Sequence, residues 1–121
     1  MINKFRIVRP LILLVGFCVT SSVFAVDAEL ALSIRQGQEI AYDRSAGNCL
    51  SCHFILDSEL PGNVGPPLIQ MKARFPDRAD LISQVSDAAK KNPDTVMPPY
   101  GRHNILTSEE IEKVVDFLHS I

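Results

Sequence analysis

The stretch Gly47-Asn48-Cys49-Leu50-Ser51-Cys52-His53, "GNCLSCH", places two thiols and an imidazole within five residues of a chain with few of either. A redox dithiol of the thioredoxin type follows a strand in a βαβ setting, and no strand pattern precedes Cys49. A structural zinc site commonly takes its four ligands from two separated pairs, and no second cysteine pair is present. A disulfide between Cys49 and Cys52 would close too small a loop to stabilise the chain much.

The histidine that directly follows Cys52 favours a fourth possibility, covalent attachment of haem. Two thiols three positions apart can add to the two vinyl groups of a haem, and the next histidine is carried beneath the iron as its proximal ligand. We therefore predict one haem c, attached at Cys49 and Cys52, with His53 as an axial ligand. A large apolar group would also stabilise a domain that is small for a core of its own.

The N-terminus has the pattern of an export signal. Three basic residues within the first nine precede an apolar run at residues 11–19, and Ala25 ends a permissive cleavage site. The run is shorter than the roughly 20 residues that a membrane-spanning helix needs. We predict a cleaved secretory signal peptide at 1–25 and a periplasmic cytochrome c domain at 26–121, without a membrane span after cleavage. Cys18 would leave with the signal.

The predicted mature domain is acidic. The chain has 12 Lys and Arg against 14 Asp and Glu, a net charge of −2, and loss of three positive charges with the signal would leave −5. A surface of this sign excludes nucleic acid as an expected partner. Cys49 and Cys52 would be the only thiols left, so attachment of haem would use every thiol of the domain.

Hydrophobic spacing of the helical period predicts an all-α fold. The expected helices cover residues 27–42, 68–74 and 77–90, and a last helix begins after Thr107. Asp77 is expected to cap the third helix, and Thr107 with Glu110 forms the pattern of a capping box. Gly37, inside the first helix, would let another element approach closely. The sequence thus predicts helices and proline-rich loops wrapped around one covalently attached haem.

The second axial ligand should come from a downstream loop. Met97 is favoured because Pro98 and Pro99 restrict the backbone that follows it, and a rigid loop suits a weak neutral ligand. A methionine opposite a histidine raises the reduction potential, which suits an electron carrier. His103 is the alternative and would give a bis-histidine site. Met71 and His119 lie on predicted helices that have packing roles.

Three further residues are predicted to support the haem. A ligating histidine normally donates its other ring N–H, and the carbonyl of Pro66 is the expected acceptor for His53. The alternative is that the prolines beside Pro66 only stiffen a turn. Tyr100 and Arg102 are predicted to hydrogen-bond the haem propionates, although an arginine beside a loop can also be simply solvated.

These features together resemble the class I cytochromes c. The resemblance rests on the cysteine motif after one helix, Gly65-Pro66 in the next loop, and Met97-Pro98 before a final helix. In that family the first and last helices cross through a glycine and an aromatic residue, and Gly37 and Phe117 match these places. A narrower resemblance, to the SoxX family, comes from "PGNVGPPL" (61–68), "RFPDRADL" (74–81) and "NPDTVMPPYGRHNILT" (92–107).

The SoxX resemblance implies a small cytochrome subunit of the SoxAX complex of bacterial sulfur oxidation. It implies a heterodimer with SoxA, a larger haem protein, acting as an L-cysteine S-thiosulfotransferase that joins thiosulfate to a cysteine of the carrier SoxY. In this family the positions of Cys49 and Cys52 attach haem, and those of His53 and Met97 are its axial ligands.

The residues themselves add a division of labour within such a complex. Without a free thiol, this chain would have no catalytic residue and would relay electrons to a soluble acceptor cytochrome. The alternative function is a free periplasmic monohaem cytochrome that serves an oxidase or reductase. Val64, Ile69, Tyr100 and Ile105 lie in the expected haem-edge loops and would either contact a partner or pack against the haem.

Overall fold

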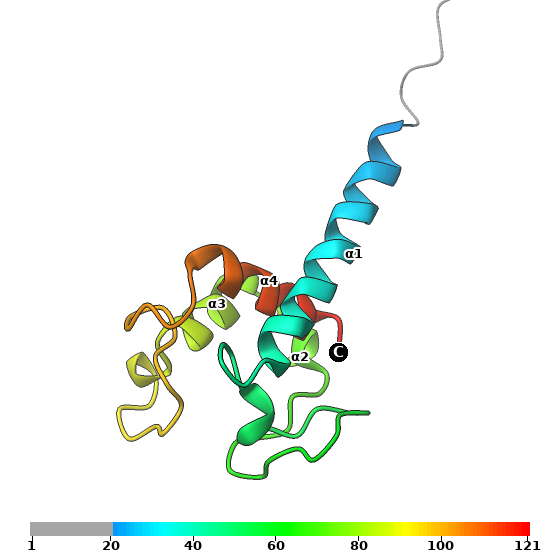
Figure 1. Cartoon of the computed structure of the whole chain (residues 1–121). Coiled ribbons are helices and arrows are strands. Elements are labelled where there is room, and N and C mark those ends of the chain that lie inside the picture. The colour runs from blue at the N-terminus through cyan, green and yellow to red at the C-terminus, as the bar shows by residue number, and fades with distance from the viewer. Residues whose placement is uncertain (1–20) are drawn as a thin grey trace, which may run out of the picture.

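The computed structural model describes residues 21–121, and every regular element in this range is helical (Figure 1). Most of the predicted signal peptide, Cys18 included, lies outside the described residues. The elements are α1 (Ser21–Tyr42), the 3₁₀ turn η1 (Cys49–Ser51), α2 (Met71–Arg74), α3 (Arg78–Ser86), the 3₁₀ turn η2 (Ala88–Lys90) and α4 (Ser108–His119). Within this range no helix is both long enough and apolar enough to span a membrane.

Three helix boundaries differ from those expected. Helix α1 begins at Ser21 rather than Asp27. Helix α2 begins only at Met71, because Gln70 has a left-handed backbone with φ 51° and cannot belong to a right-handed helix. Helix α3 ends at Ser86 rather than at Lys90, because Asp87 is extended at φ −159° and ψ 86°.

Helices α1 and α4 cross in backbone contact at Gly37. A Cβ atom at Gly37 would lie 1.9 Å from the carbonyl oxygen of Lys113, so only glycine permits this approach. One turn beyond Lys113, Phe117 packs edge-on against Tyr42, with ring centroids 5.9 Å apart and planes at 84°. The glycine and the aromatic residue predicted at the crossing are therefore both there. In Figure 1 the first turns of α1 extend beyond the rest of the domain.

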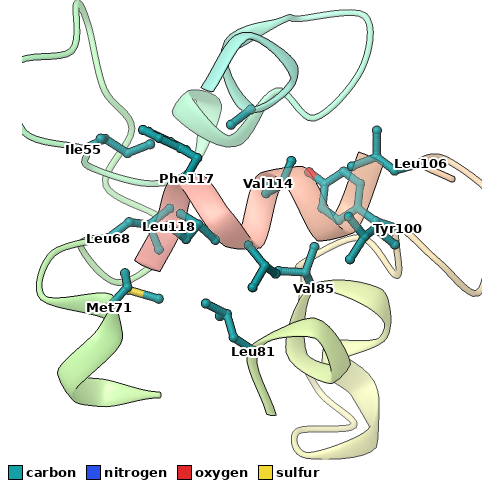
Figure 2. Close-up of a cluster of buried hydrophobic side chains, with 13 residues drawn as sticks. Ile55, Leu68, Met71, Leu81, Val85, Tyr100, Leu106, Val114, Phe117 and Leu118 are labelled. Atoms are coloured by element: carbon teal, nitrogen blue, oxygen red, sulfur yellow. The ribbon is translucent and has the colours of Figure 1, made fainter. Parts of the chain in front are cut away.

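The core gathers around one face of α4 (Figure 2). This face buries Ile111, Val114, Val115, Phe117 and Leu118. Side chains from the rest of the chain pack on it, and those of the core cluster are Ala41, Ile55, Leu68, Met71, Leu81, Val85, Tyr100 and Leu106. Burial of a side chain of this kind stabilises the fold by roughly 1.5–3 kcal/mol.

The caps of α3 and α4 are those that the sequence predicts. The Asp77 carboxylate accepts a hydrogen bond from the N–H of Ala79 at 2.8 Å. At α4 the Thr107 hydroxyl accepts from the N–H of Glu110 at 3.2 Å, and the Glu110 carboxylate accepts from the N–H of Thr107 at 2.7 Å. These bonds satisfy N–H groups that the first turn of a helix leaves free.

One carboxylate ties three helices together. Asp116 of α4 accepts from the hydroxyl of Ser33 on α1 at 2.6 Å and from the guanidinium of Arg78 on α3 at 2.8 Å. Arg78 also pairs with Glu112, one turn earlier on α4. The half-buried Asp116 thus fixes α1 and α3 on neighbouring sides of α4.

Candidate haem site

The described residues form a cavity of about 740 Å³ beside α4. Its walls come from the turn at 49–53, the loop at 64–68, helices α2 and α3, the loop at 92–106, and Val114 and Leu118 of α4. The volume falls within the roughly 300–1,000 Å³ of typical small-molecule and cofactor sites. Four residues predicted to bind haem, Cys49, Cys52, His53 and Met97, all line it, although Met97 comes from a different loop than the other three.

The cysteine motif forms one tight helical turn. Asn48 starts it with a left-handed backbone at φ 49°, and η1 follows. The N–H groups of Cys52 and His53 both donate to the carbonyl of Cys49, at 3.2 and 2.9 Å. This turn places both thiols and the imidazole on the cavity wall. It is too short to give a hydrophobic period, so sequence spacing could not predict it.

The imidazole of His53 is oriented by the following loop. Its Nδ1 lies 2.7 Å from the carbonyl oxygen of Pro66, so the hydrogen bond predicted from the sequence is present. Because a carbonyl can only accept, Nδ1 carries the proton and donates it. The lone pair is then on Nε2, which is the nitrogen available to a metal.

Gly65 lies flat against the same ring. A Cβ atom at Gly65 would stand 2.4 Å from Cε1 and 2.6 Å from Nδ1 of His53, far inside contact distance. The N–H of Gly65 donates to the carbonyl of Cys52 at 2.7 Å, and that of Gly62 donates to Leu50 at 2.7 Å. The glycine loop is therefore folded directly onto the cysteine turn and holds the imidazole in place.

On the other loop, Met97 fits the role of second ligand better than its alternatives. It is half-buried, and its N–H donates to the hydroxyl of Thr95 at 3.2 Å. His103 is exposed and does not line the cavity. Met71 lines it but is 2 % exposed within the core, with its sulfur 3.4 Å from a guanidinium nitrogen of Arg74. His119 does not line the cavity.

Tyr100 and Arg102 both contact groups of the protein itself. Tyr100 lines the cavity, but its hydroxyl donates to the carbonyl of Gly47, so its only proton is already used. Burial raises the pKa of Tyr100 to about 12. Arg102 does not line the cavity; its Nε lies 3.5 Å from the carboxylate of Asp87. Each side chain thus has a partner within the protein, and hydrogen bonds to haem propionates stay a prediction.

Two arginines outside the set of predicted haem-binding residues also line the cavity. Arg44 follows α1, and Arg74 ends α2 with a hydrogen bond of 2.6 Å to the carbonyl of Pro67. Either guanidinium could face a carboxylate of a bound group. Nothing local distinguishes them from solvated arginines, because only the tertiary fold brings them to the cavity.

The chemistry of the cavity residues fits haem better than the alternatives. Burial raises the pKa of Cys49 to about 11, whereas a redox dithiol needs a readily formed thiolate. Among residues 21–121 no group of three or more His, Cys, Asp or Glu side chains could hold a metal ion, which argues against zinc. Two thiols for attachment, an imidazole Nε2 and a thioether around an apolar cavity match haem. Bound haem would supply a one-electron iron couple.

Comparison with known proteins supports this assignment. The profile of the family described as "Cytochrome C oxidase, cbb3-type, subunit III" matches residues 33–118. A solved structure, that of SoxXA from P. pantotrophus, is similar at 29% sequence identity and a TM-score of 0.64. The match covers 71% of this chain and 79% of that one. No curated protein matches the chain.

These matches confirm the class I cytochrome c fold and the resemblance to SoxX. They agree with the helical architecture and with a cavity whose wall carries the cysteine motif. The chain belongs to the family described as cytochrome c oxidase, cbb3-type, subunit III, and is a c-type cytochrome with covalently bound haem.

Proposed function

We propose that this chain is the electron-transfer subunit of a periplasmic SoxXA-type complex, an L-cysteine S-thiosulfotransferase that joins thiosulfate to a cysteine of a SoxY-type carrier. In this proposal Cys49 and Cys52 attach a single haem, and His53 and Met97 are its axial ligands. One observation carries the haem assignment, namely the convergence of these four residues on a single cavity. The similarity to SoxXA supports the choice of complex.

The number of free thiols decides which subunit carries out the sulfur chemistry and which transfers electrons. Joining a thiolate to thiosulfate forms a sulfur–sulfur bond and releases two electrons, so the complex needs both a reactive thiol and an electron path. Cys49 and Cys52 are the only cysteines among residues 21–121, and both would be consumed by haem attachment. With a histidine and a methionine filling the coordination sphere, the iron has no open position for substrate. The sulfur chemistry is therefore assigned to the partner, and this chain passes the electrons to a soluble acceptor cytochrome.

Apolar side chains at the cavity suit contact with the haem or with a lasting partner, and the second role would favour a stable partner over a freely diffusing carrier. Val64, Val96 and Ile105 line the cavity, yet 67%, 80% and 43% of their surfaces are exposed. A free carrier commonly surrounds its haem edge with charges that steer encounters, whereas a lasting interface buries apolar surface. A larger SoxA-type haem subunit is the expected occupant of this surface.

Absorption spectroscopy of the exported protein tests the haem site. A pyridine haemochrome typical of thioether-linked haem is expected, together with a weak band near the red end of the oxidised spectrum that reports methionine ligation. The variant M97H should lose the red-end band and lower the reduction potential while keeping the haemochrome. Absence of the haemochrome from the wild type would overturn the assignment.

Co-purification from the native host tests the partner. Stoichiometric recovery with a larger haem protein is expected, and V96D should reduce it because a charge would be buried at an apolar contact. Q38D adds the same charge on an exposed position of α1 and is the matched control. A monomer at micromolar concentration, with no such companion, would instead favour the free carrier. Turnover of thiosulfate and carrier by the isolated chain at the rate of the complex would refute the division of labour.

A further inference from the structure

The side chain of Tyr100 joins two loops that line the cavity. It is buried, with 8% of its surface exposed, and belongs to the core cluster drawn in Figure 2. Its hydroxyl donates to the carbonyl of Gly47, a residue 53 positions earlier in the chain. Gly47 lies just before Cys49, and Tyr100 lies just after the Met97-Pro98-Pro99 segment. The bond therefore connects the segment of the haem cysteines to the segment of the second proposed axial ligand.

Both ends of this bond are themselves fixed. The N–H of Gly47 donates to the carbonyl of Ile40 at 3.0 Å, and a Cβ atom on Gly47 would lie 2.6 Å from that oxygen. At the other end, the carbonyl of Tyr100 accepts the N–H groups of Ile105 and Leu106 at 2.9 and 3.1 Å. Neither Gly47 nor Tyr100 can move away without breaking one of these backbone hydrogen bonds, so the pair is preorganised.

Loss of the hydrogen bond between Tyr100 and Gly47 would destabilise the folded protein. Burial raises the pKa of Tyr100 to about 12, so the hydroxyl keeps its proton at neutral pH. Gly47 is buried, and the bond is shielded from water. A variant without the donor would leave a buried carbonyl without a partner, which costs more than the net value of an ordinary hydrogen bond.

We propose that Tyr100 is a positioning residue whose bond to Gly47 keeps the Met97 loop closed against the cysteine loop. A thioether is a weak ligand, so it stays bound to an iron only while its loop stays in place. Closure by Tyr100 therefore makes Met97 harder to replace by a ligand from solution. This inference rests on the proposed ligation by His53 and Met97.

Titration of the oxidised holoprotein with imidazole tests the proposal. Imidazole competes with Met97 for the iron, and its binding is followed by loss of the weak red-end band. Y100F removes only the hydroxyl and should bind imidazole about 5- to 30-fold more tightly than the wild type. Y42F is the matched control, because the Tyr42 hydroxyl makes no hydrogen bond within residues 21–121 and its ring lies outside the cavity wall. Its imidazole affinity should equal that of the wild type.

The outcomes separate this inference from the haem assignment. A wild type without the red-end band would overturn ligation by Met97, and this inference with it. A wild type with the band, but with equal imidazole affinity in Y100F, would overturn the role of Tyr100 alone.

A measurement on the unaltered protein covers the case in which Y100F fails to incorporate haem. In the NMR spectrum of the reduced wild type, the Tyr100 hydroxyl proton should exchange slowly with solvent. It should also show a nuclear Overhauser contact with the α-protons of Gly47. Absence of that contact would refute the bond, whatever the variant does.

Discussion

At the scale of single residues, His53 is held by two neighbours that act in different ways. The carbonyl of Pro66 fixes which nitrogen carries the proton, and Gly65 fixes the plane in which the ring lies. The hydrogen bond depends on a rigid backbone, while the ring contact depends on the absence of a side chain. Both conditions come from adjacent residues, Gly65 and Pro66. A change at either should therefore alter the orientation of the imidazole more than the stability of the fold.

The variant G65A tests this arrangement. Its methyl group would stand 2.4 Å from Cε1 of His53, and the ring would have to move away from Pro66. We expect a lower yield of haem-loaded protein and a lower reduction potential in what remains, measured by pyridine haemochrome content and redox titration. G101A is the control, because its Cβ would be no nearer than 3.0 Å to a side-chain atom, that of Ser86. A loaded G65A with an unchanged potential would show that the glycine is not required.

At the scale of elements, α4 depends on its N-terminal cap for part of its stability. Thr107 and Glu110 exchange hydrogen bonds, and the carboxylate lies where the helix dipole favours negative charge. The backbone N–H of Thr107 is the main cause, and its hydroxyl a second cause, of a lowered pKa for Glu110. Since α4 carries the core face, fraying at this end would disturb the packing of the whole domain.

The lowered pKa of Glu110 gives a pH dependence of definite sign. A carboxylate with a lower pKa in the folded state stabilises it above the unfolded pKa, near 4.5, and loses this contribution as the pH falls further. In urea titrations from pH 7 to pH 3, the free energy of unfolding of the wild type should therefore approach that of E110Q. T107A removes the hydroxyl, which donates to the Glu110 carboxylate and accepts from the Glu110 N–H, but keeps the backbone bond. It should cost about 1 kcal/mol at pH 7 and reduce the change of stability with pH. A constant difference between wild type and E110Q would contradict this account.

Features that depend on neighbouring residues in the sequence could be predicted, and features that depend on tertiary contacts could not. The caps at Asp77 and Thr107 and the bond from His53 to Pro66 follow from residue types at fixed spacing. The end of α3 at Ser86 does not, because the residues that follow continue a helical pattern. There the Ser86 carbonyl accepts the N–H groups of Gly101 and Arg102, at 3.0 and 3.2 Å, from a segment that the local pattern cannot include.

The candidate site divides in the same way. The sequence could predict that the cysteine motif and Met97 meet at one cavity, because haem chemistry demands those residue types next to those neighbours. The partners of Tyr100 and Arg102 were not predictable, because each finds a group in the folded protein, Gly47 or Asp87, that is distant in sequence. The sequence alone does not show whether such a side chain bonds to a haem propionate or to a protein group that the fold brings equally close.

At the scale of the whole molecule, the cavity lies against the same helix that organises the core. Leu81, Val85, Leu106 and Val114 belong both to the core cluster and to the cavity wall. The domain therefore cannot be divided into a folded scaffold and a separate cofactor pocket. Haem is expected to contribute to folding as well as to function.

Removal of haem should consequently destabilise the chain. We expect C49A/C52A to lose most of its helical circular dichroism or to unfold without cooperativity in urea, because apolar walls around about 740 Å³ would face water. The matched control is the wild-type chain produced without haem attachment. It retains both cysteines and should behave like C49A/C52A, because both chains lack haem. Cooperative unfolding of either chain at the stability of the holoprotein would mean that the side-chain core is sufficient.

The glycine loop that rests on the cysteine turn also bears on the order in which this protein is made. Gly62 and Gly65 bond to the backbone of Leu50 and Cys52, and burial raises the pKa of the Cys49 thiol to about 11. A thiol with a raised pKa forms less of the nucleophilic thiolate, and the loop bonds hold the turn in one folded conformation. The thioether bonds should therefore form while the polypeptide is still open. Maturation then becomes a one-way sequence, in which the chain is first joined to haem and only afterwards closes around it.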